Sequence, residues 1–223
     1  MENMMQFFSE YDQMQKTCSG QELEAWLLAQ CDAHEQDYPD DQRMTGALYN
    51  ELASFYKHRN VLDKAEEAFL KAKELWEPLE KDANYATIIN NLAGTYRLLG
   101  KYDEAAALFD EAIELYRQHP ETPKELSSSA FNNLALVYMD TGKYEEAAKM
   151  LQAAYDEMKD TPGCYMEKAT TYANMAVAYY KNGDDAKTRE KLERAEELYR
   201  SGNLEETPEY QTFLKMKEIL MRS

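Results

Sequence analysis

Two stretches of this 223-residue chain are nearly identical: NNLAGTYRLLGKYDEAAALF, residues 90–109, and NNLALVYMDTGKYEEAAKML, residues 132–151. The second copy begins at Asn132, 42 residues after Asn90. Self-similarity at a fixed period of about 40 residues is typical of stacked-repeat proteins, because one such unit cannot bury its own apolar face. The pair therefore predicts a row of similar units that bury their apolar faces against their neighbours.

A turn residue closes the first half of each copy, and apolar residues precede it at fixed distances. The turn residues are Asn60, Gly100, Gly142 and Gly183, which are types that tolerate a left-handed backbone. Eight residues before each turn stands a large apolar residue, then an alanine, and three residues later a tyrosine. These triplets are Leu52, Ala53 and Tyr56; Leu92, Ala93 and Tyr96; Leu134, Ala135 and Tyr138; and Met175, Ala176 and Tyr179. Spacing of i, i+1 and i+4 places them on one helix face.

Boundary signals suggest how many units there are. We expect capping boxes at Ser19 and at Thr122, the latter with Pro123 at the first helical position, and a last helix that starts at Thr207. The expected layout is one superhelical domain over 1–223, all helical. It has a degenerate N-terminal hairpin (1–40), four repeats (42–80, 82–122, 123–164 and 165–204) and a C-terminal capping helix (207–221).

Composition narrows the function classes. The chain carries 42 acidic against 25 basic residues, a formal net charge of −17, so it repels phosphate backbones and anionic lipid heads. Three widely spaced cysteines form no disulfide or zinc pattern and suit a reducing compartment. No secretory leader, no membrane span, and no nucleotide or metalloprotease motif is recognisable. We expect a cytoplasmic protein that is not an enzyme and has no catalytic residues, metal site, cofactor, nucleic-acid partner or membrane partner.

The pattern Leu-Ala-x-x-Tyr, turn Gly, Tyr-x-Glu-Ala, Phe or Leu, and Ala resembles the tetratricopeptide repeat. The doubled asparagine, the 40–42-residue period and His119-Pro120 at a junction resemble the longer, kinesin-light-chain-like subtype. The resemblance implies a right-handed α-solenoid of about five hairpins plus the capping helix. It also implies that the first helices line a concave groove for peptides or partner proteins. The first copy departs from the pattern at Asn60, and the fourth at Thr188.

Helix geometry predicts which side chains face that groove. Positions two before and five or six after the stripe residue lie opposite the buried face, and the position just before it lies on the shoulder. The resulting candidates for peptide or partner binding are Asn50, Lys57, Asn90, Asn91, Arg97, Asn132, Asn133, Met139, Asn174, Tyr180 and Lys181. An asparagine amide donates and accepts hydrogen bonds, so a row of them can follow an extended backbone. Alternatively, these amides bond to neighbouring helices across the repeat junctions.

Two functions remain for such a chain. The first is an interaction module that holds an extended peptide or partner segment, with Lys57, Arg97 and Lys181 pairing with acidic groups on it. The alternative is a self-assembling scaffold and possible homo-oligomer, in which the first hairpin or last helix docks on another copy. A strictly monomeric protein would exclude the scaffold.

Overall fold

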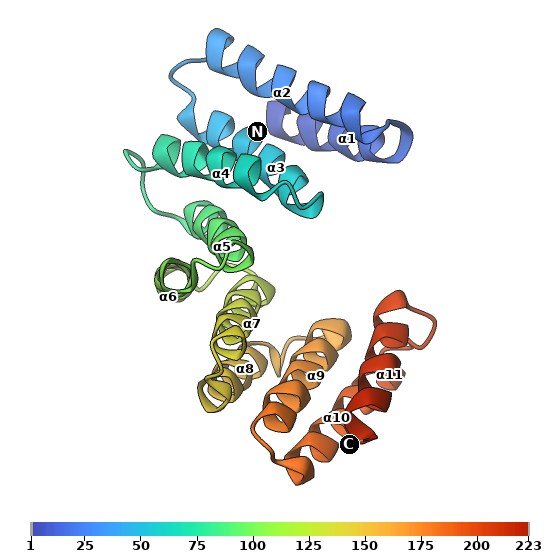
Figure 1. Ribbon diagram of the computed structural model, residues 1–223. Helices are drawn as coiled ribbons and strands as arrows, with labels where there is room; N and C mark the ends of the chain where they lie inside the picture. The colour runs from blue at the N-terminus through green and yellow to red at the C-terminus, as the bar shows by residue number, and fades with distance from the viewer. Residues whose placement is uncertain (1, 223) are drawn as a thin grey trace. The chain divides into compact units, whose positions relative to one another are not determined.

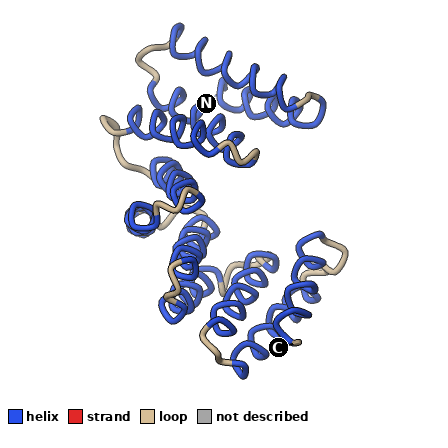
Figure 2. The backbone as a smooth tube through the Cα atoms, viewed as in Figure 1, coloured by secondary structure: helices blue, strands red, loops and turns tan. Residues whose placement is uncertain are grey.

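Helices account for nearly all of the chain. The structure is a computed structural model that describes residues 2–222, and over this range it has eleven helices and no strand (Figure 2). The helices are α1 (Glu2–Thr17), α2 (Gly20–Asp37), α3 (Gln42–His58), α4 (Leu62–Trp76), α5 (Ala83–Leu98), α6 (Tyr102–Gln118), α7 (Lys124–Asp140), α8 (Tyr144–Met158), α9 (Tyr165–Lys181), α10 (Asp185–Ser201) and α11 (Pro208–Met221). The all-helical repeat fold is therefore confirmed.

The chain forms two compact units, residues 1–101 and 102–223. In the first, α3 packs against α2, α4 and α5, and α4 packs against α5. In the second, α7 packs against α6, α8 and α9, α8 packs against α9, and α10 and α11 both pack against α9. Figure 1 shows α3 and α4, and likewise α9 and α10, as hairpin neighbours. Each helix thus contacts helices close to it in sequence, as expected for stacked repeats.

The four predicted turn residues end their helices in the left-handed conformation. Asn60, Gly100, Gly142 and Gly183 have φ of 59°, 75°, 75° and 79°. The residue after each turn donates its N–H to the carbonyl of the stripe tyrosine, as Lys143 does to Tyr138 at 2.7 Å. This six-to-one bond is the Schellman closure, and it satisfies a carbonyl that the helix end leaves without a partner.

The predicted stripes form the interior. Ala53, Ala93, Ala135 and Ala176 are fully buried, and the large residue before each is at most 3% exposed. On the second helices, Phe69, Phe109 and Leu151 are completely enclosed. Small residues opposite large ones let helices approach closely and interlock, which explains the strict alanine positions. Thr188 replaces such an alanine and stays buried, because its hydroxyl donates to the Asp184 carbonyl.

Two of the three predicted helix starts are confirmed. Ser19 and Glu22 form a reciprocal capping box, and Thr207 caps α11 with Pro208 in the first turn. The capping box expected at Thr122 is wrong. There α7 begins at Lys124 with Pro123 as its N-cap, so the Thr122 hydroxyl lies one position too early to reach the helix N–H groups. That hydroxyl is buried without a hydrogen-bond partner in the described part of the chain.

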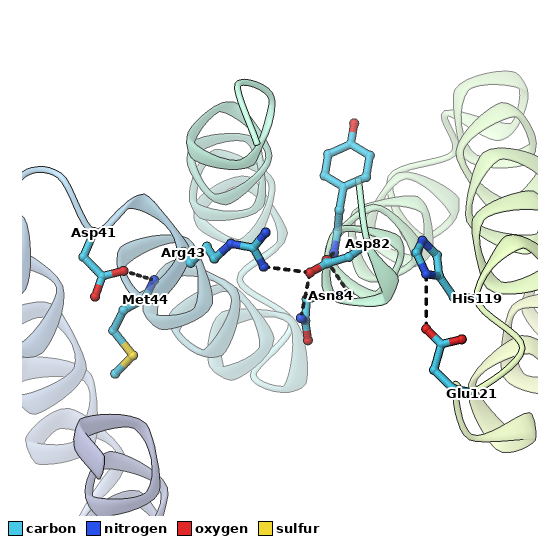
Figure 3. A network of polar contacts seen from close by, with 8 residues as sticks. Asp41, Arg43, Met44, Asp82, Asn84, His119 and Glu121 are labelled. Carbon is cyan, nitrogen blue, oxygen red and sulfur yellow. Dashed lines mark hydrogen bonds and ion pairs between the residues drawn. The ribbon is translucent and has the colours of Figure 1, made fainter. Parts of the chain in front are cut away.

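A polar contact links the starts of α3 and α5 in the first unit (Figure 3). Arg43 on α3 donates to Asp82 at 3.0 Å, and Asp82 also caps α5 by accepting from the backbone N–H groups of Asn84 and Tyr85. Burial alone would raise the pKa of Asp82. The hydrogen bonds from Tyr85 and Asn84 and the Arg43 charge outweigh burial and lower that pKa below its usual value. One carboxylate thus caps a helix and joins two repeats.

Candidate functional site

The asparagines predicted for the third and fourth repeats line one hollow in the second unit, between α7 and α9. Its volume is about 320 Å³. Asn132 and Asn133 reach it from α7 and Asn174 from α9. The other lining residues are Glu125, Ser128, Ser129, Leu136, Met158, Met166, Glu167 and Thr170. Amides, hydroxyls and two carboxylates therefore surround a partly apolar floor.

A second hollow, of about 300 Å³, adjoins the first across α9. Thr170 and Asn174 border both hollows, which makes α9 the shared wall. The far side is formed by α11, through Thr212, Phe213 and Met216. Hollows therefore lie along the second unit from α7 to α11, and both polar and apolar side chains line them.

Asn132 is fully engaged in hydrogen bonds within the protein. Its Nδ2 donates to the Ser128 carbonyl at 3.1 Å and to the Thr171 hydroxyl at 3.0 Å. Its Oδ1 accepts from Asn174 Nδ2 at 3.5 Å. Both amide hydrogens are thus in use, so this side chain connects α7 to α9 rather than presenting free donors to the hollow.

The first unit repeats this contact. Asn91 on α5 donates from Nδ2 to Asn50 Oδ1 on α3 at 3.2 Å, and Asn50 Nδ2 contacts Glu51 Oε1 at 3.3 Å. In both units, an inward asparagine accepts from the shoulder asparagine of the following repeat. The alternative in which asparagines bond across repeat junctions therefore describes Asn50, Asn91, Asn132 and Asn174. A ligand contact by any of them stays a prediction.

Asn90 and Asn133 differ from those four. Asn133 is half-buried, lines the α7–α9 hollow and makes no hydrogen bond to any residue in 2–222. Asn90 is 9% exposed, and its Oδ1 is buried without a donor among the described residues. An unpaired buried carbonyl lowers the free energy of unfolding, so we expect Asn90 on α5 to destabilise the folded protein. Asn133 is the predicted asparagine with an amide free for a ligand.

Lys57 and Arg97 come together in the first unit. Both are half-buried, at the ends of α3 and α5. Burial lowers the pKa of Lys57, and the Arg97 charge lowers it further. Gly94 leaves room for the ammonium, because a Cβ at that position would stand 3.3 Å from Lys57 Nζ. The structure thus places Lys57 beside Gly94 and within electrostatic reach of Arg97.

The remaining three predicted residues lie apart from the hollows. Met139 is half-buried and packs against the α7–α8–α9 core, so part of its side chain is structural. Tyr180 is half-buried and Lys181 is exposed at the end of α9. None of the three lines either hollow described above. Their assignment to partner binding remains a prediction.

One groove was missed by the sequence reasoning. It lies between α2 and α4 over α3, has a volume of about 630 Å³ and is floored by Tyr49, Leu52 and Tyr56. Ion pairs close it at both ends, Lys64 with Glu24 at 2.8 Å and Lys71 with Glu35 at 3.1 Å. The first hairpin lacks the repeat signature. The sequence therefore did not indicate which residues of α2 would lie opposite α4.

Metal-ligating side chains and thiols are further candidates for a site in residues 2–222. No group of three or more metal-ligating side chains occurs in the described residues. The three cysteines are free thiols, and burial raises the pKa of the Cys31 thiol to about 12, which keeps it protonated at neutral pH. None of the described helices is both long and apolar enough to cross a membrane.

Comparison with known families agrees with this geometry. The tetratricopeptide repeat family model matches residues 44–118 and 126–201, which is more than half of the chain. The chain therefore belongs to the tetratricopeptide repeat family. Repeats of this family generally serve as protein-interaction modules and typically carry no catalytic activity.

Solved structures show the same fold. BtubC (BKLC) from P. vanneervenii aligns with a TM-score of 0.77 at 23% identity, over 86% of this chain and 78% of that one. A Podosopora anserina putative kinesin light chain with nearly identical TPR-like repeats aligns with a TM-score of 0.72 at 19% sequence identity, over 87% of this chain and 93% of that one. MamA aligns with a TM-score of 0.61 at 16% sequence identity, over 86% of this chain and 95% of that one. At these identities the likeness concerns the fold alone.

Proposed function

We propose that this chain is an interaction module that binds an extended peptide segment of a partner protein along the inner face of α7, α9 and α11. The observation that carries the proposal is the pair of adjoining hollows that share Thr170 and Asn174. A peptide in extended conformation presents an N–H and a C=O at every residue and side chains on alternate sides. A trough formed by the two hollows, lined by both polar and apolar side chains, complements both features.

Each part of the trough has a role in this proposal. The Asn133 amide and the Ser129 and Thr170 hydroxyls hydrogen-bond to the peptide backbone, and Glu125 and Glu167 accept from its N–H groups. Leu136, Met166, Phe213 and Met216 receive its apolar side chains. Asn132 and Asn174 support this surface by fixing the spacing between α7 and α9. The ligand is thus expected to carry apolar anchors separated by polar residues.

The test uses the whole chain and a selected ligand. Nonapeptides are selected from a random displayed library, and the tightest is synthesised and titrated calorimetrically against wild type and Asn133→Ala. We expect Asn133→Ala to weaken binding about five- to tenfold, because it removes one ligand hydrogen bond of about 1 kcal/mol. The control is Asn182→Ala, an exposed residue at the end of α9, which should leave affinity unchanged. Equal affinities for wild type and Asn133→Ala would reject the assignment.

A self-assembling scaffold is the second candidate, favoured by exposed apolar residues at both ends. Met5 on α1 is 74% exposed and Ile219 on α11 is 66% exposed, each with a partly exposed apolar neighbour, Phe8 or Met221. Apolar surface at the end of a repeat array can dock on another copy. Light scattering over a concentration series decides, since a constant monomer mass excludes this function.

The remaining expectations belong to the same proposal. We place the protein in the cytoplasm, where a reducing environment suits three free thiols. Its partners are proteins rather than nucleic acids or membranes, because the net charge of −17 opposes phosphate-rich surfaces.

A further inference from the structure

The groove between α2 and α4 has apolar surface that the repeat fold does not require. Leu28 on α2 and Leu70 on α4 line this groove and are 40% and 42% exposed. They are 42 residues apart, which is one repeat period. The next three repeats form their hairpins with polar residues at the position of Leu70, namely Asp110, Gln152 and Glu193. The two exposed leucines are therefore candidates for contact with another molecule.

Two carboxylates flank Leu70 on the same side of α4. Glu67 and Glu74 are exposed and line the groove, and neither forms an ion pair within residues 2–222. They stand three residues before and four residues after Leu70, a spacing that places all three on one side of the helix. The two lysines of the groove are already paired with carboxylates of α2. The exposed edge of α4 is thus an apolar residue between two negative charges.

The end of α11 carries the opposite charges around an exposed apolar residue. Ile219 is 66% exposed, with Lys215 four residues before it and Arg222 three residues after it. Both basic side chains are exposed. Lys215 forms no ion pair in the described part of the chain, and Arg222 pairs with Glu218 of its own turn. The order is positive, apolar, positive, which complements the edge of α4.

We propose that α11 of a second copy docks antiparallel to α4 along this groove, with its Ile219 between Leu28 and Leu70. The groove has a volume of about 630 Å³, which leaves room for an isoleucine and the aliphatic stems of the basic residues beside it. Ile219 lines neither hollow proposed for the peptide. The inference goes beyond peptide binding, and it rests on the self-assembly given above as the second candidate function.

Charge complementarity selects the antiparallel orientation. When the central apolar residues of the two helices face each other antiparallel, Glu67 lies opposite Arg222 and Glu74 lies opposite Lys215. Each pair of like charges is seven residues apart on its own helix, about 10.5 Å, so both ion pairs form together. A parallel pair would place both charges one residue out of register. Such ion pairs at a rim fix register and orientation, while the apolar contact supplies most of the affinity.

The contact joins two different surfaces, so it is head-to-tail. One copy can use its groove and its α11 at the same time and thereby contact two neighbours. Contacts of this kind build a ring if the rotation closes and a filament if it does not. A single helix-on-groove contact is small, so we expect association that rises with protein concentration.

Light scattering of the whole chain over a concentration series is the first experiment. The average mass of wild type should rise with concentration, whereas Leu70→Gln and Ile219→Gln should each stay monomeric. Gln152→Ala, at the matching position of the third repeat, is the control and should associate like wild type. A wild type of constant monomer mass overturns the inference and the scaffold function together. Wild-type association that Leu70→Gln leaves intact overturns this docking surface alone, so the two failures are distinguishable.

Mixing the two variants tests the head-to-tail arrangement. Leu70→Gln keeps an intact α11, and Ile219→Gln keeps an intact groove. The mixture should form a dimer of one copy of each and nothing larger, because a single complementary pair of surfaces remains. A mixture that stays monomeric, although wild type associates, overturns the proposal.

Charge reversal tests the pairing of the two helices. Glu67→Lys with Glu74→Lys should weaken association about tenfold or more, and so should Lys215→Glu with Arg222→Glu, because like charges then face each other. All four changes in one chain should restore association to near the wild-type level. The matched control is Glu145→Lys, at an exposed residue of α8, which should leave association unchanged. Reversals that do not compensate each other contradict the antiparallel pairing.

Discussion

At the scale of single residues, one amino-acid type has two roles on the inner face. Asn132 uses both amide hydrogens and its carbonyl within the protein, whereas the buried Asn90 carbonyl has no donor among the described residues. Both stand two positions before a stripe leucine. Hydrogen-bonded amides stabilise a repeat junction, and an unpaired buried carbonyl destabilises it.

This difference predicts opposite effects of the same substitution. Asn90→Leu should raise the free energy of unfolding by about 1 kcal/mol, because it removes an unpaired buried carbonyl and keeps a similar volume. Asn132→Leu should lower it by about 1–3 kcal/mol, because three hydrogen bonds are lost and their partners stay buried. Chemical denaturation of the two variants beside wild type measures both. A stability loss in Asn90→Leu would show that this carbonyl has an internal partner.

At the scale of elements, the sequence predicted what depends on local geometry. The four turns followed from Asn60 and the turn glycines, because a left-handed helix end restricts residue type. The Thr122 capping box failed because Pro123 is the N-cap and α7 begins at Lys124, one residue later than expected. The sequence offered hydrogen bonds across the repeat junctions as one alternative, but it could not show which asparagines form them, since this depends on ångström-scale rotation between neighbouring helices.

The turns predict a small and specific stability cost. A Cβ added at Gly142 meets nothing within 4 Å, so alanine there is penalised only by the left-handed backbone, at about 1–2 kcal/mol. Asparagine tolerates this backbone conformation, as Asn60 shows in the first repeat. Gly142→Asn should therefore lower the free energy of unfolding by less than Gly142→Ala does. Thermal unfolding of the two variants ranks them. Equal losses would mean that the backbone conformation is not the cause.

The Asp82 junction predicts a dependence on pH. The pKa of Asp82 is lower in the folded protein than in the unfolded chain, where it is about 4. The contribution of Asp82 to the free energy of unfolding is therefore complete above the unfolded-state pKa, and it is lost as the pH falls through the folded-state pKa. Asp82→Asn should therefore lower the unfolding midpoint at pH 7, and the gap to wild type should shrink in acid. The measurement is urea unfolding from pH 7 to pH 3. A gap that is constant over this range would contradict a charge effect.

At the scale of the whole molecule, the packing is sequentially local. Helices contact neighbours that are close in sequence, and the core divides accordingly. One buried cluster joins Ala135, Leu151 and Met175, and another joins Leu192, Tyr199 and Phe213. In such an array, stability is approximately a sum of repeat terms and nearest-neighbour interfaces, so damage to one cluster can stay local.

Leu192→Ala tests this directly. Leu192 is 1% exposed in the α9–α10–α11 cluster, and its truncation should cost about 2–5 kcal/mol through lost burial and a cavity. Amide hydrogen exchange should become faster in α9, α10 and α11, whereas α2, α3 and α4 should keep their wild-type protection. Glu193→Ala, at an exposed neighbour on the same helix, serves as the control and should change neither region. If Leu192→Ala instead accelerated exchange equally in all helices, the chain would unfold as one cooperative block. The loss of peptide affinity expected from a damaged α9–α11 wall would then be inseparable from global unfolding.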